Sequence, residues 1–251
     1  MSISLLTIQS VAVVLLAISL TVAELATIDA DQPLVDGQKK CTEDYDFDYI
    51  LLANQWPEAF CETNKCTAHR DVWSIHGGWP QWSNTSTKWP QNCCFEREFD
   101  SGLLDPIKPK LLANWRTLKS SGTDDQFWSH EWQTHGTCAM RAPLLRGELN
   151  YFQGTLKMFD QLALDKWLSV AGIVPSMDKA YEVSALHSAI ESALGRRVAI
   201  ECLTKKHNNS PILSQLNVCI GKDDLRPIDC PDNVQDKRCG SDTVAYLPSK
   251  N

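Results

Sequence analysis

Hydrophobic positions along the chain predict β-strands near both ends of the protein. One strand is expected at Phe47–Trp56, where aromatic and β-favouring residues run up to Pro57, and another at Val72–His76, which leads into two glycines. Two more are expected at Val198–Cys202 and Leu213–Ile220, because the hydrophobic period falls towards two there.

Helical spacing of hydrophobic residues separates these two groups of strands. Helices are expected around Ile107–Leu118, from Gln126 to Gly136, at Tyr151–Leu162 and at Val183–Leu194. Asp124 or Asp125 is expected to cap the second helix, and Gly195 to end the last one. No repeat or long linker divides the chain, so we predict a single α+β domain.

The N-terminus has a pattern of its own. Val11–Leu20 is nearly all apolar, no Lys or Arg precedes Lys39, and small residues stand at Thr21 and Ala23. An apolar run of about ten residues is too short to cross a bilayer. We therefore predict a signal peptide over residues 1–23, cleaved near Ala23, and a mature domain over 24–251 without a membrane segment. A retained membrane anchor is the alternative.

Composition narrows the class of protein. The chain has 251 residues, of which 43% are hydrophobic and 22% charged, so a disordered or collagen-like chain is excluded. Ten cysteines after a secretory leader predict a disulfide framework, and zinc is disfavoured because no C-x-x-C occurs. Asn84 and Asn208 begin glycosylation sequons. We therefore predict that the protein is secreted or resides in a lysosomal or vacuolar lumen.

Two histidine-containing segments carry the candidate chemistry: WSIHGGWP with His76, and FWSHEWQTHGTC with His130, Glu131 and His135. On a helix, Glu131 and His135 share a face, so the carboxylate can orient the imidazole or raise its pKa. His130 can reach the same cleft. A zinc-protease motif needs two histidines four residues apart, whereas these are five apart, so we expect no metal and no cofactor.

Two imidazoles without a nearby Ser or Cys nucleophile suit cleavage of a phosphodiester by a neighbouring hydroxyl. One imidazole accepts the proton of the 2′-OH and the other donates a proton to the leaving 5′ oxygen. RNA supplies that hydroxyl and DNA does not. Trp79 and Trp89 bracket a polar loop after His76, where an aromatic face can stack a base. The remaining histidines, His69, His187 and His207, are interpreted as structural.

At these segments the sequence resembles the RNase T2 family of secreted endoribonucleases. The resemblance implies an antiparallel sheet with packed helices and metal-independent cleavage of single-stranded RNA through a 2′,3′-cyclic phosphate, by an enzyme of broad base preference. We expect a monomer. It implies that His135 is the general base and His76 the general acid, with Glu131 in the catalytic group and His130 holding the phosphate. It also implies base contacts from Trp79, Gln81 and Trp89.

The resemblance further implies a pairing of the cysteines. Four bridges are expected, Cys61–Cys66, Cys93–Cys138, Cys202–Cys239 and Cys219–Cys230. Cys41 and Cys94 are left over, and we pair them with each other.

Two residues depart from the family pattern. Gly78 stands where the family has Leu, which removes packing beside His76, and Thr134 stands where the family has a Lys that stabilises charge on the phosphorane. Arg70 or Lys88 is a candidate substitute for that cation. We expect Thr134→Lys to raise turnover. The alternative function is a weak or inactive effector of the same fold that binds RNA or a protein partner.

The formal net charge of −7 is unusual for a protein that binds RNA. Protonating all six histidines would bring the sum to −7 + 6 = −1, so an acidic compartment relieves much of the repulsion. We therefore predict a local cationic site and best activity below neutral pH.

Overall fold

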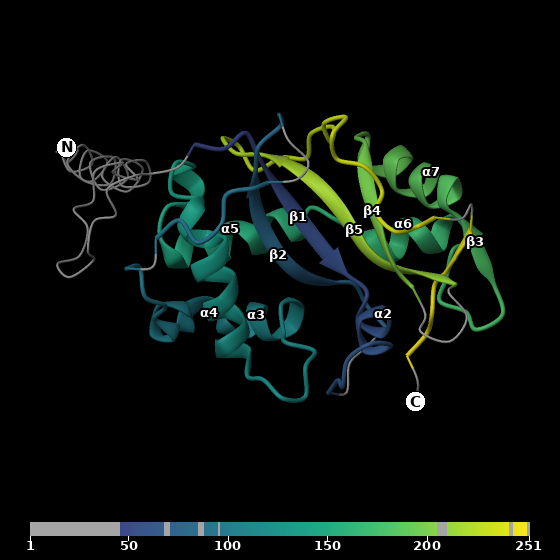
Figure 1. Ribbon diagram of the computed structural model, residues 1–251, viewed down its shortest axis with the longest axis horizontal. Coiled ribbons are helices and arrows are strands. Elements are labelled where there is room, and N and C mark those ends of the chain that lie inside the picture. Colours follow the sequence, from purple (N-terminus) through teal and green to yellow (C-terminus); the bar gives the residue numbers. More distant parts are fainter. Residues whose placement is uncertain are drawn as a thin grey trace, which may run out of the picture. The chain divides into compact units, whose positions relative to one another are not determined.

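A largely antiparallel sheet organises the protein in the computed structural model (Figure 1). The structure describes residues 46–67, 71–84, 88–94, 96–204, 210–240 and 243–249. The strands are β1 Tyr49–Gln55, β2 Ser74–Gln81, β3 Ala180–Glu182, β4 Val198–Thr204, β5 Pro211–Gly221 and β6 Thr243–Ala245. β1 pairs with β2 and with β5, β4 pairs with β5, and β3 pairs with β6, all antiparallel. The predicted α+β fold is confirmed.

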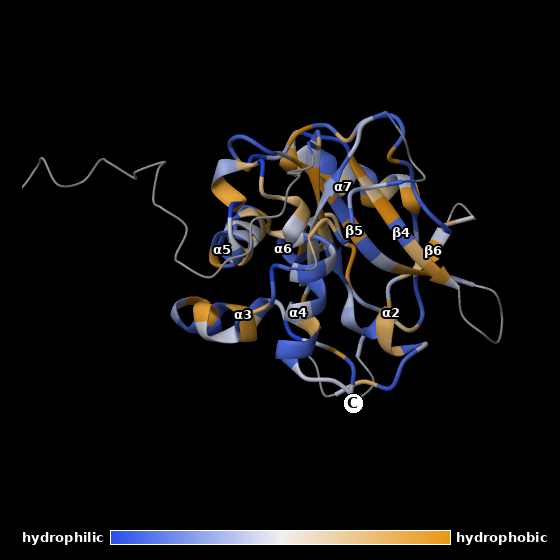
Figure 2. Ribbon diagram, turned by 60° about the vertical axis from the view of Figure 1, so that its left-hand side comes forward, coloured by the Kyte–Doolittle hydropathy of each residue, from blue (hydrophilic) through white to orange (hydrophobic). Residues whose placement is uncertain are grey.

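Helices lie behind and beside this sheet (Figure 1). They are α2 Pro57–Cys61, α3 Lys108–Asn114, α4 Asp124–Thr134, α5 Glu148–Phe159, α6 Leu164–Val170 and α7 Val183–Leu194, with 3₁₀ turns at Ser101–Ile107, Gly136–Cys138 and Pro143–Leu145. α5 and α6 lie behind the sheet in Figure 1, and Phe152 and Leu156 of α5 share the main core with Leu52 and Ile75 of the strands. The helices show hydrophobic and hydrophilic residues side by side, as expected for helices with one buried face (Figure 2).

The other face of the sheet carries a smaller apolar cluster. Tyr49 and Leu51 of β1 pack there with Cys219 of β5, and Trp79 of β2 lies against them. Further along the same two strands, Gln55 pairs in register with Gln215. Side chains alternate along a strand, so this face changes from apolar to polar towards one end of the sheet.

Four disulfides connect the described elements. They are Cys61–Cys66, Cys93–Cys138, Cys202–Cys239 and Cys219–Cys230, the four bridges that the sequence analysis expected. Cys41 lies outside the described residues, so its pairing with Cys94 stays a prediction.

Two element ends and several short elements differ from the sequence prediction. β2 does not stop at His76 but continues through the two glycines to Gln81, because Gly77 and Gly78 pair with β1. The helix expected to reach Leu118 ends at Asn114, since Trp115 leaves helical geometry at φ −138° and ψ 52°. α6 and the short strands β3 and β6 were missed because short elements carry little periodicity.

The cap of α4 also differs from the prediction. Thr123, not Asp124 or Asp125, is the N-cap: its hydroxyl accepts from Gln126 N at 3.2 Å, and Gln126 Oε1 accepts from Thr123 N at 3.0 Å. Asp124 instead accepts from Thr117 N at 2.8 Å. Gly195 ends α7 in the left-handed conformation, as expected.

His187 of α7 contacts two carboxylates, one on its own helix and one on the C-terminal segment. Its Nδ1 lies 3.0 Å from Glu191 Oε1 and its Nε2 lies 2.9 Å from Asp236 Oδ2. Asp236 also accepts from Ile200 N of β4 at 2.8 Å. The hydrogen bond with Asp236 raises the pKa of His187 above its usual value, against the effect of partial burial.

Because the folded pKa of His187 is raised, its protonation stabilises the fold fully below the unfolded pKa, and this contribution is lost as the pH rises through the folded pKa. Asp236 keeps its charge in the same window, since its own pKa is lowered. We expect His187→Gln to cost about 1–2 kcal/mol at pH 5 and less at pH 8. Thermal melts of both proteins at the two pH values check this; an equal loss at both would contradict it.

Candidate active site

A β-bulge sets the position of His76. Ala53 of β1 pairs with Gly77, whereas the next residue, Asn54, pairs with Ile75, so His76 is the extra residue of β2. A bulge re-aims the side chain that it carries. The backbone carbonyl of His76 accepts from Trp115 Nε1 at 2.9 Å, and its ring Nδ1 lies 2.9 Å from Gln215 Oε1. Since that oxygen accepts, Nδ1 carries the proton and Nε2 is left for other partners.

α4 supplies the second group of candidate residues. Glu131 is buried in its last turns, and His135 is the C-cap residue, with its backbone N donating to Glu131 O at 3.0 Å. The Cys93–Cys138 disulfide follows directly and ties this end of the helix to the loop after β2. His130 lies on the exposed side of the same helix.

Loss of this bridge should affect both stability and activity. Cys93 and Cys138 are separated by 45 residues, whereas Cys61 and Cys66 are separated by 5. Loop-closure entropy predicts losses of about 4 kcal/mol and about 2 kcal/mol for the two double Cys→Ser variants. Urea unfolding checks the order, and RNA cleavage should fall more in the Cys93/Cys138 variant. Equal effects on both measurements would contradict the expectation.

Trp79 brings the two segments together. Its ring centroid lies 4.9 Å from that of His76 and 5.2 Å from that of His135, and its Nε1 donates to Glu131 Oε2 at 3.0 Å. This arrangement depends on Gly77, because a Cβ at that position would lie 2.2 Å from both Trp79 Nε1 and Glu131 Oε2. Two imidazoles and one carboxyl therefore surround a single indole.

Burial dominates the electrostatics of the helix residues. It raises the pKa of Glu131 to about 8, although the Trp79 hydrogen bond opposes the shift. It lowers the pKa of His135 to about 3, with smaller effects from the charges of His130 and His76. Nδ1 of His135 is buried without a hydrogen-bond partner among the described residues.

The expected partnership of Glu131 with His135 is therefore wrong. The carboxyl of Glu131 accepts from Trp79, not from the imidazole, and the pKa of His135 is lowered rather than raised. The two residues share a helix, but His135 begins the turn away from the helix axis at the C-cap. Desolvation of the site then exceeds any effect of a carboxyl that is itself largely protonated.

Burial also lowers the pKa of His76, and the hydrogen bond to Gln215 opposes this shift. The positive charges of His130 and Lys119 lower it further. Without a bound anion, both His76 and His135 therefore favour the neutral form near neutral pH.

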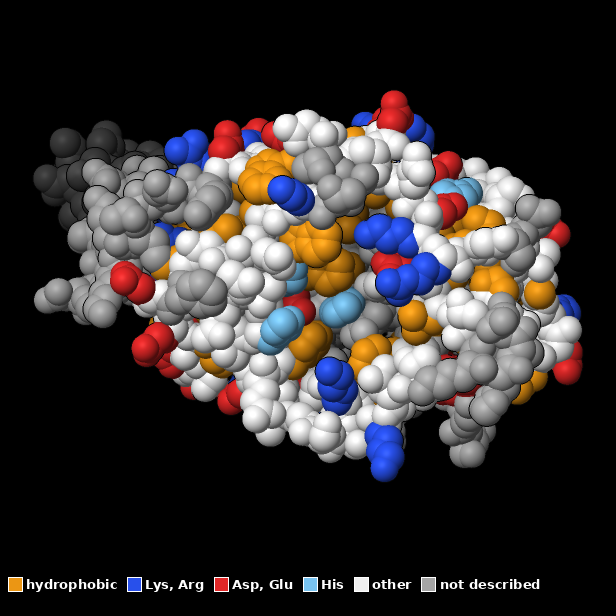
Figure 3. All heavy atoms as spheres, in the orientation of Figure 1, with side chains coloured by type: hydrophobic (Ala, Val, Ile, Leu, Met, Phe, Trp, Pro, Cys, Tyr) orange, Lys and Arg blue, Asp and Glu red, His pale blue; other side chains and the backbone are white. Residues whose placement is uncertain are grey.

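A cavity of about 340 Å³ opens beside these residues. Its lining includes His76, His130, Glu131 and Phe127 together with Lys119 and its neighbours in the chain. Histidine and acidic side chains lie among hydrophobic ones at the centre of this face of the molecule, with basic side chains around them (Figure 3). Thr134 Oγ1 lies 3.5 Å from Nδ1 of His130, so the position of the expected lysine is next to the site and uncharged.

The predicted base-contact residues lie on β2 and the loop after it. Gln81 is half-buried two residues beyond Trp79, so both side chains leave the same face of the strand. Trp89 is 39% exposed, in the segment that resumes after residues 85–87. The sequon residue Asn84 is exposed, whereas Asn208 lies outside the described residues.

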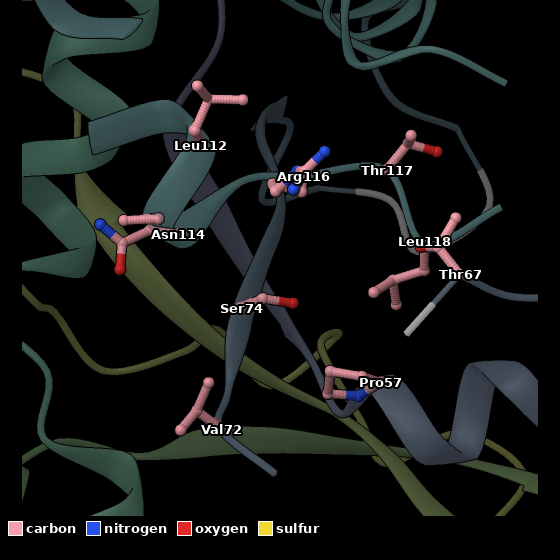
Figure 4. Close-up of a pocket in the computed structure, with 10 residues that line it drawn as sticks. Pro57, Thr67, Val72, Ser74, Leu112, Asn114, Arg116, Thr117 and Leu118 are labelled. Carbon is pink, nitrogen blue, oxygen red and sulfur yellow. The ribbon is translucent and has the colours of Figure 1, made fainter. Parts of the chain in front are cut away.

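A second cavity, of about 330 Å³, lies at the edge of β2, lined by Ser74, Asn114, Arg116 and Leu118 among others (Figure 4). Its arginine already pairs with Asp124, at 3.1 Å between Nη2 and Oδ2. The histidine cavity is therefore the better candidate for an active site.

Gly78 does not leave a gap in the packing, contrary to expectation. A Cβ there would lie 2.8 Å from Oγ1 and 3.2 Å from Cγ2 of Thr155, with Met158 of α5 beyond them. The Gly78 carbonyl also accepts from the Tyr151 hydroxyl at 3.1 Å. Side chains of α5 thus fill the space that a leucine would take.

Three residues of the site were missed by sequence reasoning. Gln215 lies far from both histidine segments along the chain, whereas Trp115 and Lys119 lie in the stretch just before the second segment. Neither spacing nor composition distinguishes these three residues. For Gln215, the one available signal was its place on a predicted strand, which did not reveal the strand's neighbours.

Comparison with known proteins identifies the family. The sequence model of the ribonuclease T2 family matches residues 47–230. The chain belongs to this family. It is 35% identical over 182 residues to ribonuclease Oy of Magallana gigas, covering 71% of this chain and 85% of that protein. It is 32% identical over 208 residues to intracellular ribonuclease LX of Solanum lycopersicum, covering 80% of this chain and 84% of that protein.

The fold agrees with that assignment. The crystal structure of RNase NT in complex with 5′-AMP superposes with a TM-score of 0.73 and 32% identity, covering 82% of this chain and all of that one. These ribonuclease T2 relatives support a ribonuclease. The described part of the chain contains no helix long and apolar enough to cross a membrane, and no cluster of three or more His, Cys, Asp or Glu side chains suited to a metal.

Proposed function

We propose that the protein is an endoribonuclease that cleaves single-stranded RNA by transesterification, with His135 as general base and His76 as general acid. The observation that carries this proposal is the contact of both imidazoles with Trp79: the ring centroids of His135 and His76 lie 5.2 Å and 4.9 Å from that of the indole. Family membership supports the reaction class, and both RNase NT and this chain share the fold.

In the proposed reaction His135 accepts the proton of the 2′-OH while the 2′ oxygen attacks phosphorus. The bond from phosphorus to the 5′ oxygen breaks, and His76 gives that oxygen a proton through Nε2. The products are a 2′,3′-cyclic phosphate and a free 5′-OH. Because the pKa of His135 is about 3, its imidazole is neutral and able to accept a proton throughout the mildly acidic range.

His76 must be protonated to act as the acid, although burial lowers its pKa. A bound phosphodiester anion counteracts that shift, because a neighbouring negative charge favours the imidazolium. His130, on the exposed side of the cavity, is proposed to hold the phosphate, and Trp79, Gln81 and Trp89 to contact bases. Glu131 is protonated below pH 8 and keeps Trp79 in place through its hydrogen bond.

The test is an assay of the disulfide-bonded protein on single-stranded RNA between about pH 4 and pH 8, in excess EDTA. The proposal expects cleavage with 2′,3′-cyclic phosphate ends and no cleavage of DNA of the same sequence, because DNA lacks the attacking hydroxyl. Loss of activity on adding EDTA would contradict metal independence. Products with 5′-phosphate ends would contradict the transesterification.

The alternative proposal is a weak or inactive effector, favoured by the neutral Thr134 beside His130. It predicts that the folded protein binds single-stranded RNA or a protein partner but does not cleave RNA at any pH in that assay. Retention of two imidazoles in one site favours the enzyme, since binding alone has no need of an acid and a base.

We propose that the protein works in an oxidising compartment, outside the cell or in a lysosomal or vacuolar lumen. Four disulfides and the apolar run Val11–Leu20 support this, whereas one relative is named intracellular. N-terminal sequencing of protein purified from its source would show cleavage near Ala23. An intact Met1 would contradict it.

A further inference from the structure

In this chain the second histidine segment lacks the lysine of the family motif, because Thr134 stands in its place. A lysine from another part of the chain lines the histidine cavity. Thr134 offers a neutral hydroxyl beside His130. Of the two substitutes considered from sequence, Arg70 lies outside the described residues, and Lys88 is exposed on the loop after β2. Among the described residues that line the histidine cavity, Lys119 is the one with a permanent positive charge. It faces the cavity with His76 and His130.

The fold holds the backbone of Lys119 in place. Lys119 forms a β-bridge with Cys66, whose disulfide closes a short loop with Cys61. On either side of it, Thr67 N donates to Leu118 O at 3.0 Å and Ser120 N donates to Lys65 O at 3.0 Å. Hydrogen bonds on both sides of the lysine thus hold this segment against residues 65–67, which follow α2.

Lys119 is also not neutralised by its surroundings. No ion pair joins it to an acidic side chain in the described part of the chain. The acidic residue of the cavity, Glu131, is protonated below pH 8. Lys119 is close enough to His76 to lower its pKa. A cavity with uncompensated positive charge suits an anion in a protein whose net charge is −7.

We propose that Lys119 contacts the scissile phosphate of RNA and supplies the positive charge that Thr134 lacks. The inference rests on the proposed function, and Lys119 takes no part in proton transfer, which His135 and His76 carry out. Its charge stabilises the additional negative charge that develops on the phosphate oxygens as the 2′ oxygen attacks. The cation thus comes from the loop before α4 instead of from the helix.

Kinetics of Lys119→Ala on a dinucleoside monophosphate test the proposal. We expect kcat to fall about 10- to 100-fold, less than for a buried donor because Lys119 is exposed and screened by solvent. Lys119→Arg should keep most of the activity. The matched control is Lys157→Ala, which removes one positive charge from the exposed side of α5 and should change kcat by less than about twofold.

A rescue variant separates a charge effect from a structural one. Thr134→Lys in the Lys119→Ala background should restore kcat, and it should raise kcat less in the wild-type protein, where a cation is already present. Inhibition by inorganic phosphate should weaken in Lys119→Ala and recover in the double variant. Melting temperatures show whether each variant is folded; if Lys119→Ala is not, Lys119→Gln against Lys119→Arg makes the same comparison.

The outcomes distinguish the two proposals. If the wild-type protein cleaves RNA and Lys119→Ala behaves like Lys157→Ala, the assignment of Lys119 is overturned and the proposed ribonuclease stands. If folded Lys119→Ala loses activity and Thr134→Lys does not restore it, the proposal that Lys119 acts through its positive charge is overturned. If the wild-type protein cleaves no RNA, the proposed function itself fails.

Discussion

His135→Ala is expected to slow RNA cleavage by about 10²–10⁴-fold, and His76→Ala by a similar factor, because each removes one partner of a coupled proton transfer. The double variant should be little worse than either single variant, since the two residues act as a unit. Steady-state kcat/KM on a short RNA checks these values. Losses that multiply in the double variant would show that the two imidazoles act in separate steps.

A third histidine provides the control. His187 is bonded to two carboxylates on α7 and the C-terminal segment, away from the histidine cavity. His187→Gln should therefore leave kcat/KM unchanged at temperatures well below its melting point. A loss comparable to that of His135→Ala would mean that the assay reports folding rather than catalysis.

The roles of His135 as base and His76 as acid also predict how activity depends on pH. The base works when His135 is neutral, which holds above about pH 3, so the acidic limb of kcat/KM should extend well below pH 5. The acid works when His76 is protonated, and its pKa is below the ordinary value, so activity should already decline as the pH approaches neutrality. The optimum is therefore acidic, as the net charge also suggested. An optimum above pH 7 would refute the assignment of acid and base.

Gly77→Ala is expected to reduce activity by about 10²-fold or more although it leaves every candidate catalytic residue unchanged. The added Cβ would lie 2.2 Å from Trp79 Nε1 and from Glu131 Oε2, so the hydrogen bond between them cannot keep its geometry. Trp79 packs against both imidazoles, and a misplacement of about 1 Å at reacting groups costs about 10²-fold.

Gly102→Ala is the matched control for this change. A Cβ at Gly102 would meet only the flexible carboxylate of Asp100, at 3.1 Å, and this 3₁₀ turn is outside the histidine cavity. Activity and melting temperature should stay close to those of the wild type. If Gly77→Ala behaved in the same way, the close packing of Trp79 and Glu131 over Gly77 would not be needed for catalysis.

The sequence alone predicted most of the long strands and the two segments that carry the candidate site residues. β1, β4, β5 and α7 were predicted because long buried strands and a long amphipathic helix leave a clear periodicity. The two histidine segments also stood out, because Trp, His and Gly gather there at high density. Their resemblance to one family added the four cysteine pairs present in the described chain.

Sequence reasoning failed at the end of β2, which it placed before Gly77 and Gly78. Gly77 and Gly78 indicated the end of a strand, because glycine is uncommon inside one. In the structure each has a packing reason to lack a side chain: Gly77 lies under Trp79 and Glu131, and Gly78 lies against Thr155. The bulge at His76 depends on the register with β1, which no local pattern of β2 contains.

The electrostatic state of the site was decided by tertiary structure alone. A helical spacing of four suggested that Glu131 could orient the imidazole of His135 or raise its pKa, but burial raises the pKa of Glu131 and lowers that of His135. Sequence likewise showed that Thr134 lacks a positive charge, whereas only the folded chain brings Lys119 to the cavity that His76 and His130 line. Residue types and local periodicity are properties of the chain itself, whereas desolvation and the approach of distant charges exist only after packing, and these set the chemistry of the site.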